Sequence, residues 1–385
     1  MKVLYAAIDQ SVPDAHGGSV HVTSVAEGLA ARGHEVHVLA TPGPRPFPPG
    51  RVTWYAVRPP IGIRQLRFLR ASQVGHLADA IRPDVVIERY YNFGGEGILA
   101  ARRIGAVPVL EVNAPITDHP GSRKQLLDAL LLVQPMRRWR DWQCRTAALI
   151  VTPSTKILPA DVPREKILQV EWGADTERFH PAASGPVPFA RAASDTVVIF
   201  VGAFRVWHGA IHLIEAIRRL RQRGRLDITA VLVGDGPELP AVRKAAAGLD
   251  GVTFTGALAH DQVPACLAAA DVGVAPFDLA AHPPLAREFY WSPLKIFEYM
   301  AAGLPVVTPR IERLAHVVRD GREGLLYDPT DPAALAAALE RLADARVRVP
   351  LGTAARARAV QQFSWQHHCE MLDLAIQAAR GACAS

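Results

Sequence analysis

The sequence predicts an α/β protein with two parallel sheets in succession, and three observations support that prediction. The chain has 385 residues, which is long for a single core and suits two domains of about 180 residues each. Apolar, β-branched runs alternate with amphipathic helical segments in two separate series, an order typical of parallel sheets. Hydrophobic residues make up 49% of the chain and charged residues 21%, a composition that excludes intrinsic disorder.

The first series begins at the N-terminus. Residues 3–8 are predicted to form a buried strand, which is followed by a glycine-containing loop and by a helix that ends near Gly33. The apolar face of that helix carries Val22, Val25, Ala26, Leu29 and Ala30. Later strands are predicted at residues 36–40, 84–87, 107–112 and 149–152.

The second series follows a segment, residues 179–194, that is rich in Pro, Ala and Ser and has no periodicity, as expected for a linker. Asp331 and Pro332 form a start signal for a helix over 333–342, and the last helix is predicted at 364–379. Together the two series predict two Rossmann-like halves. The strands of the second half are predicted at 196–201, 228–233, 252–255, 272–275 and 305–308, and its first helix carries Leu213, Ile214, Ile217 and Leu220.

Several classes of protein are excluded by what the sequence lacks. No apolar run approaches the roughly 18 residues of a membrane helix, and Asp9 comes too early for a signal peptide, so we expect a cytoplasmic protein. The motifs of P-loop nucleotide binding, of zinc proteases and of serine hydrolases are absent, and so is D-x-D, which argues against a nucleotide held through a metal. The cysteines have no paired spacing that would predict a disulfide framework or a zinc site; they are Cys144, Cys266, Cys369 and Cys383.

The net charge of +6 favours anionic partners, and the charge is uneven. Residues 58–70 carry four arginines and no acid, and residues 123–145 combine six basic residues with leucines and two tryptophans. Segments that combine basic residues, apolar residues and tryptophan are typical of weak contact with a membrane surface, which here would be the inner membrane. A solvated helix face explains the second stretch equally well. No nucleic-acid recognition motif accompanies either stretch.

The most informative motif is the stretch 289–305, FYWSPLKIFEYMAAGLP. Ser292 and Pro293 are predicted as N-cap and first helical residue, so that free N–H groups and the helix dipole favour an anion there. Lys295 adds a positive charge, and Glu298, on the same face, suits two ribose hydroxyls. The alternative is a core helix that buries Leu294, Phe297, Met300 and Ala301, but such a helix does not need Lys and Glu beside its apolar stripe.

Loops that follow strands supply further candidates. Gly17 and Gly18 allow close approach of a phosphate or sugar to the backbone. Gly202 begins a loop in which Arg205 suits a diphosphate and His208 suits either that role or a helix start. Gly234 opens a loop that approaches a nucleobase or ribose, or forms an ordinary turn.

A histidine of the first half is the candidate for the reacting sugar. His119 follows the strand that ends in Glu111-Val-Asn113, and His16, in the glycine loop, competes with it. Both sit beyond the carboxyl end of a predicted strand.

Taken together, these motifs resemble the retaining, GT-B-fold glycosyltransferases of family 4, the group 1 glycosyl transferases. The resemblance covers nearly the whole chain, because the motifs occur in the family's order and spacing. They are HGGS, GADTERFHP, FVGAFRVWHG, VLVGDGPE, SPLKIFEYMAAGLPVV, GLLYDPTDPAALAAALERL and FSWQHH.

The resemblance implies two Rossmann-like domains that face each other across a cleft. Residues 1–178 would form an acceptor-binding domain, against which the helix 364–380 packs, and residues 195–363 would form the nucleotide-sugar-binding domain. A hexose-type sugar would pass from a nucleoside-diphosphate donor to a polysaccharide, lipid-linked or small-molecule acceptor, without a metal or other cofactor. The donor's own phosphate would accept the acceptor's proton during front-face attack.

The resemblance also assigns roles to residues. Arg205 and Lys295 would stabilise the departing nucleoside diphosphate, Glu298 would hold the ribose, and His119 would line the sugar pocket. The donor would further be contacted through the backbone by Gly17, Gly18, Gly202, Gly234, Ser292 and Leu294.

Three positions depart from the family's pattern. The first of two glutamates separated by seven residues is Tyr290 here, with Glu288 two residues out of register. His208 replaces a lysine, which predicts a weaker or pH-dependent phosphate contact. Trp172 stands where asparagine is usual, and the sequence offers no reason for it. The alternative functions are a sugar-nucleotide epimerase or phosphorylase on the same fold, and a non-catalytic protein that binds sugar nucleotides.

Overall fold

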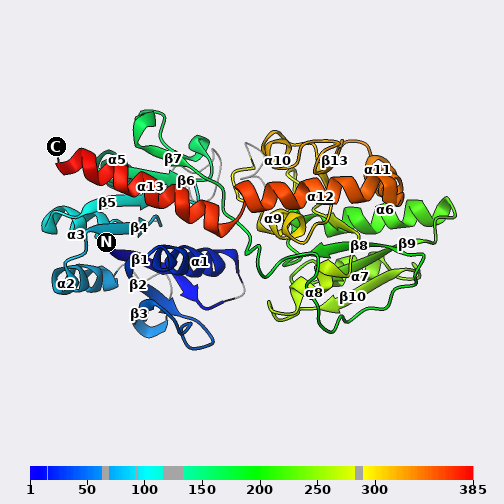
Figure 1. Cartoon of the computed structure of the whole chain (residues 1–385), viewed down its shortest axis with the longest axis horizontal. Helices are drawn as coiled ribbons and strands as arrows, with labels where there is room; N and C mark the ends of the chain where they lie inside the picture. The colour runs from blue at the N-terminus through cyan, green and yellow to red at the C-terminus, as the bar shows by residue number, and fades with distance from the viewer. Residues whose placement is uncertain (15, 63–68, 92–93, 116–132, 282–288, 385) are drawn as a thin grey trace. The chain divides into compact units, whose positions relative to one another are not determined.

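The computed structural model of the chain, drawn in Figure 1, describes all residues except 15, 63–68, 92–93, 116–132, 282–288 and 385. The chain divides into two compact units. The first unit comprises Met1–Trp172, Tyr290–Ser292 and Trp365–Ser385. The second comprises Gly173–Phe289 and Pro293–Ser364, so that residues 179–194, expected as a linker, belong to the second unit.

The first unit is built on a parallel sheet of seven strands in the order β3-β2-β1-β4-β5-β6-β7. Each strand predicted for this half is present. Two short strands at the sheet's edges, β3 and β7, were not predicted, because half-exposed edge strands lack a continuous apolar run. The strands are β1 (Lys2–Val12), β2 (Glu35–Pro42), β3 (Val52–Ala56), β4 (Val85–Arg89), β5 (Val107–Glu111), β6 (Leu149–Thr152) and β7 (Ile167–Gln169).

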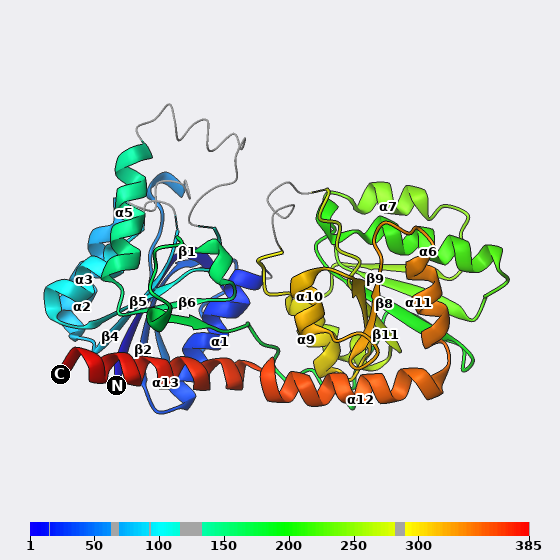
Figure 2. The same cartoon turned by 90° about the horizontal axis from the view of Figure 1, so that it is seen from above.

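Helices cover both faces of this sheet, as Figure 2 shows for α1 and α13 on one side and α2 and α3 on the other. The C-terminal helix α13 packs against α1, β5 and β6, so a segment from the end of the sequence completes the first unit. The helices are α1 (Gly17–Ala31), α2 (Ala71–Ile81), α3 (Glu96–Ile104), α5 (Val133–Thr146) and α13 (Trp365–Ala384), with short 3-10 turns η1 (Pro60–Gly62), η3 (Thr155–Ile157) and η4 (Arg164–Lys166).

The second unit repeats the plan with a six-stranded parallel sheet in the order β10-β9-β8-β11-β12-β13. Its strands are β8 (Thr196–Val201), β9 (Ile228–Val233), β10 (Val252–Gly256), β11 (Val272–Val274), β12 (Val306–Pro309) and β13 (Gly324–Tyr327). Its helices are η5 (Val206–His208), α6 (Ala210–Gln222), α7 (Leu239–Ala245), α8 (Val263–Ala268), α9 (Leu294–Ala301), α10 (Glu312–Val317), α11 (Ala334–Leu342) and α12 (Ala345–Gln362).

Both sheets confirm the predicted α/β class, and both have a point where the strand order reverses. In the first sheet this point lies between β1 and β4, and in the second between β8 and β11. Open parallel sheets bind ligands beyond the carboxyl ends of the strands at such a point. The loops that follow β1, β4, β8 and β11 are therefore where a site is expected in each unit.

Helix boundaries agree with the sequence within a few residues. The helix predicted at 333–342 is α11, which begins at Ala334, and the carboxylate of Asp331 accepts a hydrogen bond of 2.8 Å from the Ala333 N–H. The helix predicted at 364–379 is α13, which continues to Ala384. Among the helices within the described ranges, none is long and apolar enough to cross a membrane.

Candidate active-site residues in the two units

The loop between β8 and α6 carries the first candidate cation. Phe204 has a backbone φ of 35°, a value that residues other than glycine rarely adopt. Its buried ring packs edge-to-face on the ring of Phe200, with centroids 5.3 Å apart. Strained backbone of this kind is held by its surroundings and clusters at functional sites. The turn presents Arg205 on the surface, with its guanidinium 5.9 Å from the centroid of the Trp207 ring.

Lys295, on the first turn of α9, is the second candidate cation. Its Nζ atom is buried and has no hydrogen-bond partner. The amine lies 4.5 Å from the centroid of the Phe200 ring and 5.2 Å from that of Phe277, the latter just beyond the end of β11. Burial lowers the pKa of Lys295 to about 7, although Glu298 acts in the opposite direction.

His208 lies beside Lys295, and Gly202 makes room for both. A Cβ atom on Gly202 would lie 2.7 Å from Lys295 Nζ and 3.0 Å from His208 Nδ1. His208 Nδ1 is buried and has no hydrogen-bond partner. Burial lowers the pKa of His208 to about 2, helped by the positive charges of Lys295 and Arg205. The two predicted cations, Lys295 and Arg205, therefore both lower the pKa of the His208 imidazole.

Glu298 stands one turn further along α9 and keeps its carboxylate partly exposed. Its Oε1 lies 3.7 Å from Nε2 of His260, a residue that the sequence analysis did not select. The Glu298 side chain is 14% exposed, and a carboxylate accepts hydrogen bonds from hydroxyls, which is the role predicted for it. The predicted three-residue spacing of Lys295 and Glu298 on α9 is present.

The predicted cap of this helix is wrong. α9 begins at Leu294, its N-cap position is occupied by Pro293, and no side chain caps it. Ser292 instead accepts a hydrogen bond of 3.2 Å from the Trp172 N–H and donates one of 2.7 Å to the Glu171 carboxylate. The hydroxyl is engaged within the first unit, so it is not available to the helix end.

The glycines of the next loop have a packing role. Gly234 has a φ of 126°, and a Cβ atom there would lie 1.9 Å from the carbonyl oxygen of Gly202. Gly236 has a φ of 152°, and its Cβ atom would lie 2.0 Å from the Ala203 carbonyl oxygen. The loop after β9 thus lies directly against the loop after β8, which places Gly202 and Gly234 together as candidates.

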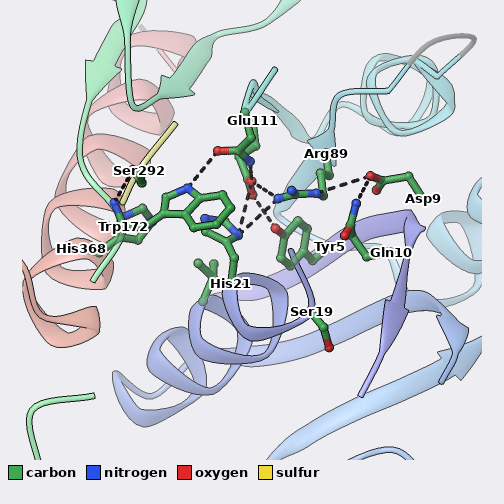
Figure 3. A network of polar contacts seen from close by, with 12 residues as sticks. Tyr5, Asp9, Gln10, Ser19, His21, Arg89, Glu111, Trp172, Ser292 and His368 are labelled. Atoms are coloured by element: carbon green, nitrogen blue, oxygen red, sulfur yellow. Dashed lines mark hydrogen bonds and ion pairs between the residues drawn. The ribbon is translucent and has the colours of Figure 1, made fainter. Parts of the chain in front are cut away.

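The first unit holds a buried polar network formed by residues within β1 and by the last residues of β4 and β5, shown in Figure 3. Arg89 donates a hydrogen bond of 2.6 Å to Glu111, and its Nε lies 3.5 Å from the Asp9 carboxylate. Tyr5 also donates to Glu111. Burial lowers the pKa of Arg89, and the charges of Glu111 and Asp9 more than offset this effect, so the pKa lies above its ordinary value. One oxygen of Asp9, Oδ1, is buried and has no hydrogen-bond partner.

Trp172 joins this network, which accounts for a residue that the sequence did not explain. Its indole N–H donates a hydrogen bond of 3.0 Å to Asn113, whose amide in turn donates to Glu111. The ring packs against His21 with centroids 4.4 Å apart, as Figure 3 shows. His368 of α13 contacts the Glu171 carbonyl oxygen at 2.8 Å. Four separate segments of the chain therefore meet around Trp172.

The glycine loop of the first unit lies at the N-terminus of α1. Gly17 is the first residue of that helix, and a Cβ atom on Gly18 would lie 2.1 Å from the side-chain oxygen of Gln10. His16, the alternative catalytic histidine, caps α1, because its Nδ1 accepts a hydrogen bond of 3.2 Å from the Ser19 N–H. Both observations give local structural reasons for residues that were predicted as ligand contacts.

Two predicted positions, His119 and Glu288, lie outside the described residues. Tyr290, at the usual first-glutamate position, is buried and packs edge-to-face with Trp291 at 5.3 Å. Within the ranges that the structure describes, no cluster of three or more metal-ligating side chains occurs.

The sequence analysis did not select several residues that the structure gathers at the strand ends. Arg89 closes β4 and Phe277 follows β11, whereas Asp9 and Gln10 lie within β1, just after the strand predicted at residues 3–8. Polar and aromatic residues at or near the ends of predicted strands are the signal that points to them; they are Asp9, Gln10, Arg89 and Phe277.

Comparison with protein families identifies both units. Residues 15–178 match the family described as Glycosyltransferase Family 4, and residues 195–345 match the family described as Glycosyl transferases group 1. The two matches follow one another along the chain and together include both glycine loops and the Lys295 motif.

Full-length relatives support the same assignment. The chain is 26% identical to alpha-maltose-1-phosphate synthase of Mycolicibacterium smegmatis, over 93% of this chain and 94% of the relative. It is also 26% identical to the GDP-mannose-dependent alpha-mannosyltransferase of Corynebacterium glutamicum, over 97% and 87%. Anabaena HepE, solved with UDP and glucose, has the same fold, with a TM-score of 0.69, 19% identity and coverage of 98% and 100%. The chain belongs to glycosyltransferase family 4, whose members have the GT-B fold and transfer sugars from nucleotide donors to varied acceptors.

Proposed function

We propose that this glycosyltransferase moves a hexose from a nucleoside-diphosphate sugar to a sugar-containing or lipid-linked acceptor with retention of configuration. The second unit holds the donor and the first unit holds the acceptor. The charge of the diphosphate is neutralised by side chains, without a divalent cation. The observation that carries this proposal is the buried, unpaired amine of Lys295 beside His208 and Gly202, at the strand-order reversal of the second sheet.

The chemistry follows from where charge develops. As the glycosidic bond breaks, negative charge moves onto the diphosphate, and preorganised cations at that point lower the barrier. Lys295 and Arg205 supply those cations, and Glu298 accepts hydrogen bonds from the ribose. The donor's phosphate accepts the proton of the attacking hydroxyl, so no protein base is assigned.

The donor base and sugar are proposed from the relatives. One relative is named as GDP-mannose-dependent, and HepE was solved with UDP and glucose. Both names are consistent with a hexose on a nucleoside diphosphate. UDP-glucose and GDP-mannose are therefore the first donors to test.

Contact with an anionic membrane surface is proposed for the basic side of the first unit. Ile61 is 87% exposed and Leu69 is 57% exposed, and Arg58 and Arg70 flank them in the sequence. Exposed apolar side chains among arginines suit a headgroup region. The tryptophans of α5 do not contribute a free apolar face, because Trp139 and Trp142 stack on each other at 4.6 Å and Trp139 donates to the Gly94 carbonyl. Sedimentation with vesicles of anionic lipid and of neutral lipid tests this contact.

Release of nucleoside diphosphate from UDP-glucose or GDP-mannose tests the central proposal. The full-length protein is expected to release diphosphate, and Lys295→Ala and Glu298→Gln are each expected to lower the rate at least a hundredfold. Lys244→Ala and Glu165→Gln are matched controls, since both residues are exposed on other helical segments. Unchanged turnover in the Lys295 and Glu298 variants would remove the assignment of this site.

A further inference from the structure

The proposed diphosphate site contains two buried nitrogens that have no partner. Lys295 Nζ and His208 Nδ1 are both inaccessible to water and form no hydrogen bond. Both lie within 3.0 Å of the point where a Cβ atom on Gly202 would stand. Two buried polar nitrogens beside the same glycine are placed to share one anionic group.

The surroundings of this pair disfavour positive charge. Phe200 and Phe277 replace water around the Lys295 amine, at 4.5 and 5.2 Å from their centroids. An ammonium group without a hydrogen-bond partner or a close counter-ion loses its hydration and is costly to bury. Aromatic rings recover only a part of that cost.

Charged and titratable groups approach the site from several neighbouring elements. Glu298, on the same helix, favours the charged form of Lys295, but its carboxylate lies near His260. The η5 loop contributes His208 and Arg205, and Arg205 disfavours a second positive charge on His208. Asp278, beyond β11, contacts His212 at 3.1 Å. From α12, Arg356 donates to the Ala301 carbonyl at the far end of α9.

We propose that Lys295 and His208 form a proton-coupled anion site, in which the binding of a nucleoside diphosphate draws protons onto two buried nitrogens that otherwise have no hydrogen-bond partner. This inference rests on the proposed function and adds to it a further binding residue, His208, and a dependence on pH. The four-carbon stem of Lys295 lets the amine reach the phosphate by side-chain rotation.

The pKa directions agree with this geometry. Burial brings the pKa of Lys295 to about 7 and that of His208 to about 2 in the empty protein. An adjacent anion favours the charged form of both groups. Above pH 7, therefore, binding is accompanied by protonation of Lys295, and at lower pH the remaining uptake belongs to His208.

The site consequently responds to the charge of its ligand. A free diphosphate carries more negative charge than the same diphosphate esterified to a sugar, so it pulls protons onto the site more strongly. Proton uptake then strengthens the interaction as the leaving group forms, which is the differential stabilisation that catalysis requires.

Isothermal titration calorimetry with UDP and GDP tests this inference. The binding enthalpy is measured at pH 8 in several buffers of different ionisation enthalpy, and the slope gives the number of protons taken up. The expected slope is about 0.9 proton, because a group with a pKa of about 7 is roughly 90% neutral at pH 8. The affinity is expected to fall close to tenfold for each pH unit above 8.

Two variants assign the protons. Lys295→Arg keeps a charge that does not titrate, so the slope at pH 8 is expected to fall near zero while binding persists. The difference between the native protein and His208→Gln at pH 6.5 isolates the histidine, since the ligand's own titration cancels in the comparison. A positive difference is expected.

The outcomes separate this inference from the proposed function. Normal binding with a zero slope at pH 8, or a slope that persists in Lys295→Arg, would overturn the proton coupling and leave the transferase intact. An equal slope at pH 6.5 in the native protein and in His208→Gln would remove His208 from the site. Failure of the native protein to bind any nucleoside diphosphate would contradict the proposed function itself.

Discussion

The amine of Lys295 lies 4.5 Å from the centroid of the Phe200 ring, and it has no hydrogen-bond partner in the described part of the chain. A lysine in this position destabilises the folded protein, because its charged form is desolvated. The protein keeps it in the first turn of α9, where the proposed donor phosphate is bound. Stability is given up for function at this position.

Lys295→Met is therefore expected to stabilise the fold while it abolishes diphosphate binding. Since the pKa of Lys295 is lowered on folding, the unfolded chain binds more protons between about pH 7 and pH 10, and the native protein becomes more stable as pH rises through that window. The gain from Lys295→Met should be larger at pH 6 than at pH 9, by about 2.7 kcal/mol. Urea unfolding at the two pH values measures this difference, and an equal gain at both would contradict it.

Gly202→Ala is expected to weaken diphosphate binding at least tenfold. The new methyl group would lie 2.7 Å from Lys295 Nζ and 3.0 Å from His208 Nδ1, so it would displace the two nitrogens that are proposed to bind the anion. Gly381→Ala is the matched control, because nothing lies within 4 Å of a Cβ atom there. Calorimetric titration with UDP or GDP decides between a role in binding and a role in the turn alone.

Glu111→Gln is expected to destabilise the first unit by about 3 to 5 kcal/mol, because it leaves the buried Arg89 with one distant carboxylate. The exposed pair Arg103–Asp79, at 2.8 Å, provides the comparison. Asp79→Asn is expected to cost less than about 1 kcal/mol. Urea unfolding of both variants at pH 7 tests the contrast, and similar losses would show that burial does not set the strength of the Arg89 pair.

Trp172→Phe is expected to cost about 1 kcal/mol, since it keeps the contact with His21 and removes the hydrogen bond to Asn113. Trp172→Ala should cost at least twice as much, because it also removes the ring. Thermal unfolding ranks the two variants. If both cost the same, the hydrogen bond rather than the packing dominates.

Much of the fold and part of the candidate site could be predicted from the sequence. The predicted strands of both halves are present because most of them are apolar, β-branched runs, and β8 and β9 have the predicted ends. Lys295 and Glu298 share a helix face because a helical spacing of three is a local property of the chain. The motifs were sufficient to predict the family because they occur in a fixed order and spacing.

Local patterns failed where distant segments compete for the same group. Ser292 has the sequence of an N-cap, yet its hydroxyl bonds to Glu171 and Trp172, 120 or more residues earlier. His16, the alternative catalytic histidine, caps α1 through a local contact with the Ser19 N–H, and its role in catalysis stays a prediction.

The sequence by itself determined the alternation of strands and helices, the family, and which helix carries Lys295 and Glu298, because periodicity, turn residues and motif order are written along the chain. Only the tertiary structure decided that Phe200, Phe277, Gly202 and His208 surround the Lys295 amine, and that Trp172 joins Asn113 to the Arg89–Glu111 network. The reason is physical: burial, loss of hydration and hydrogen-bond competition depend on which distant residues become neighbours, and these set the charge of a buried group.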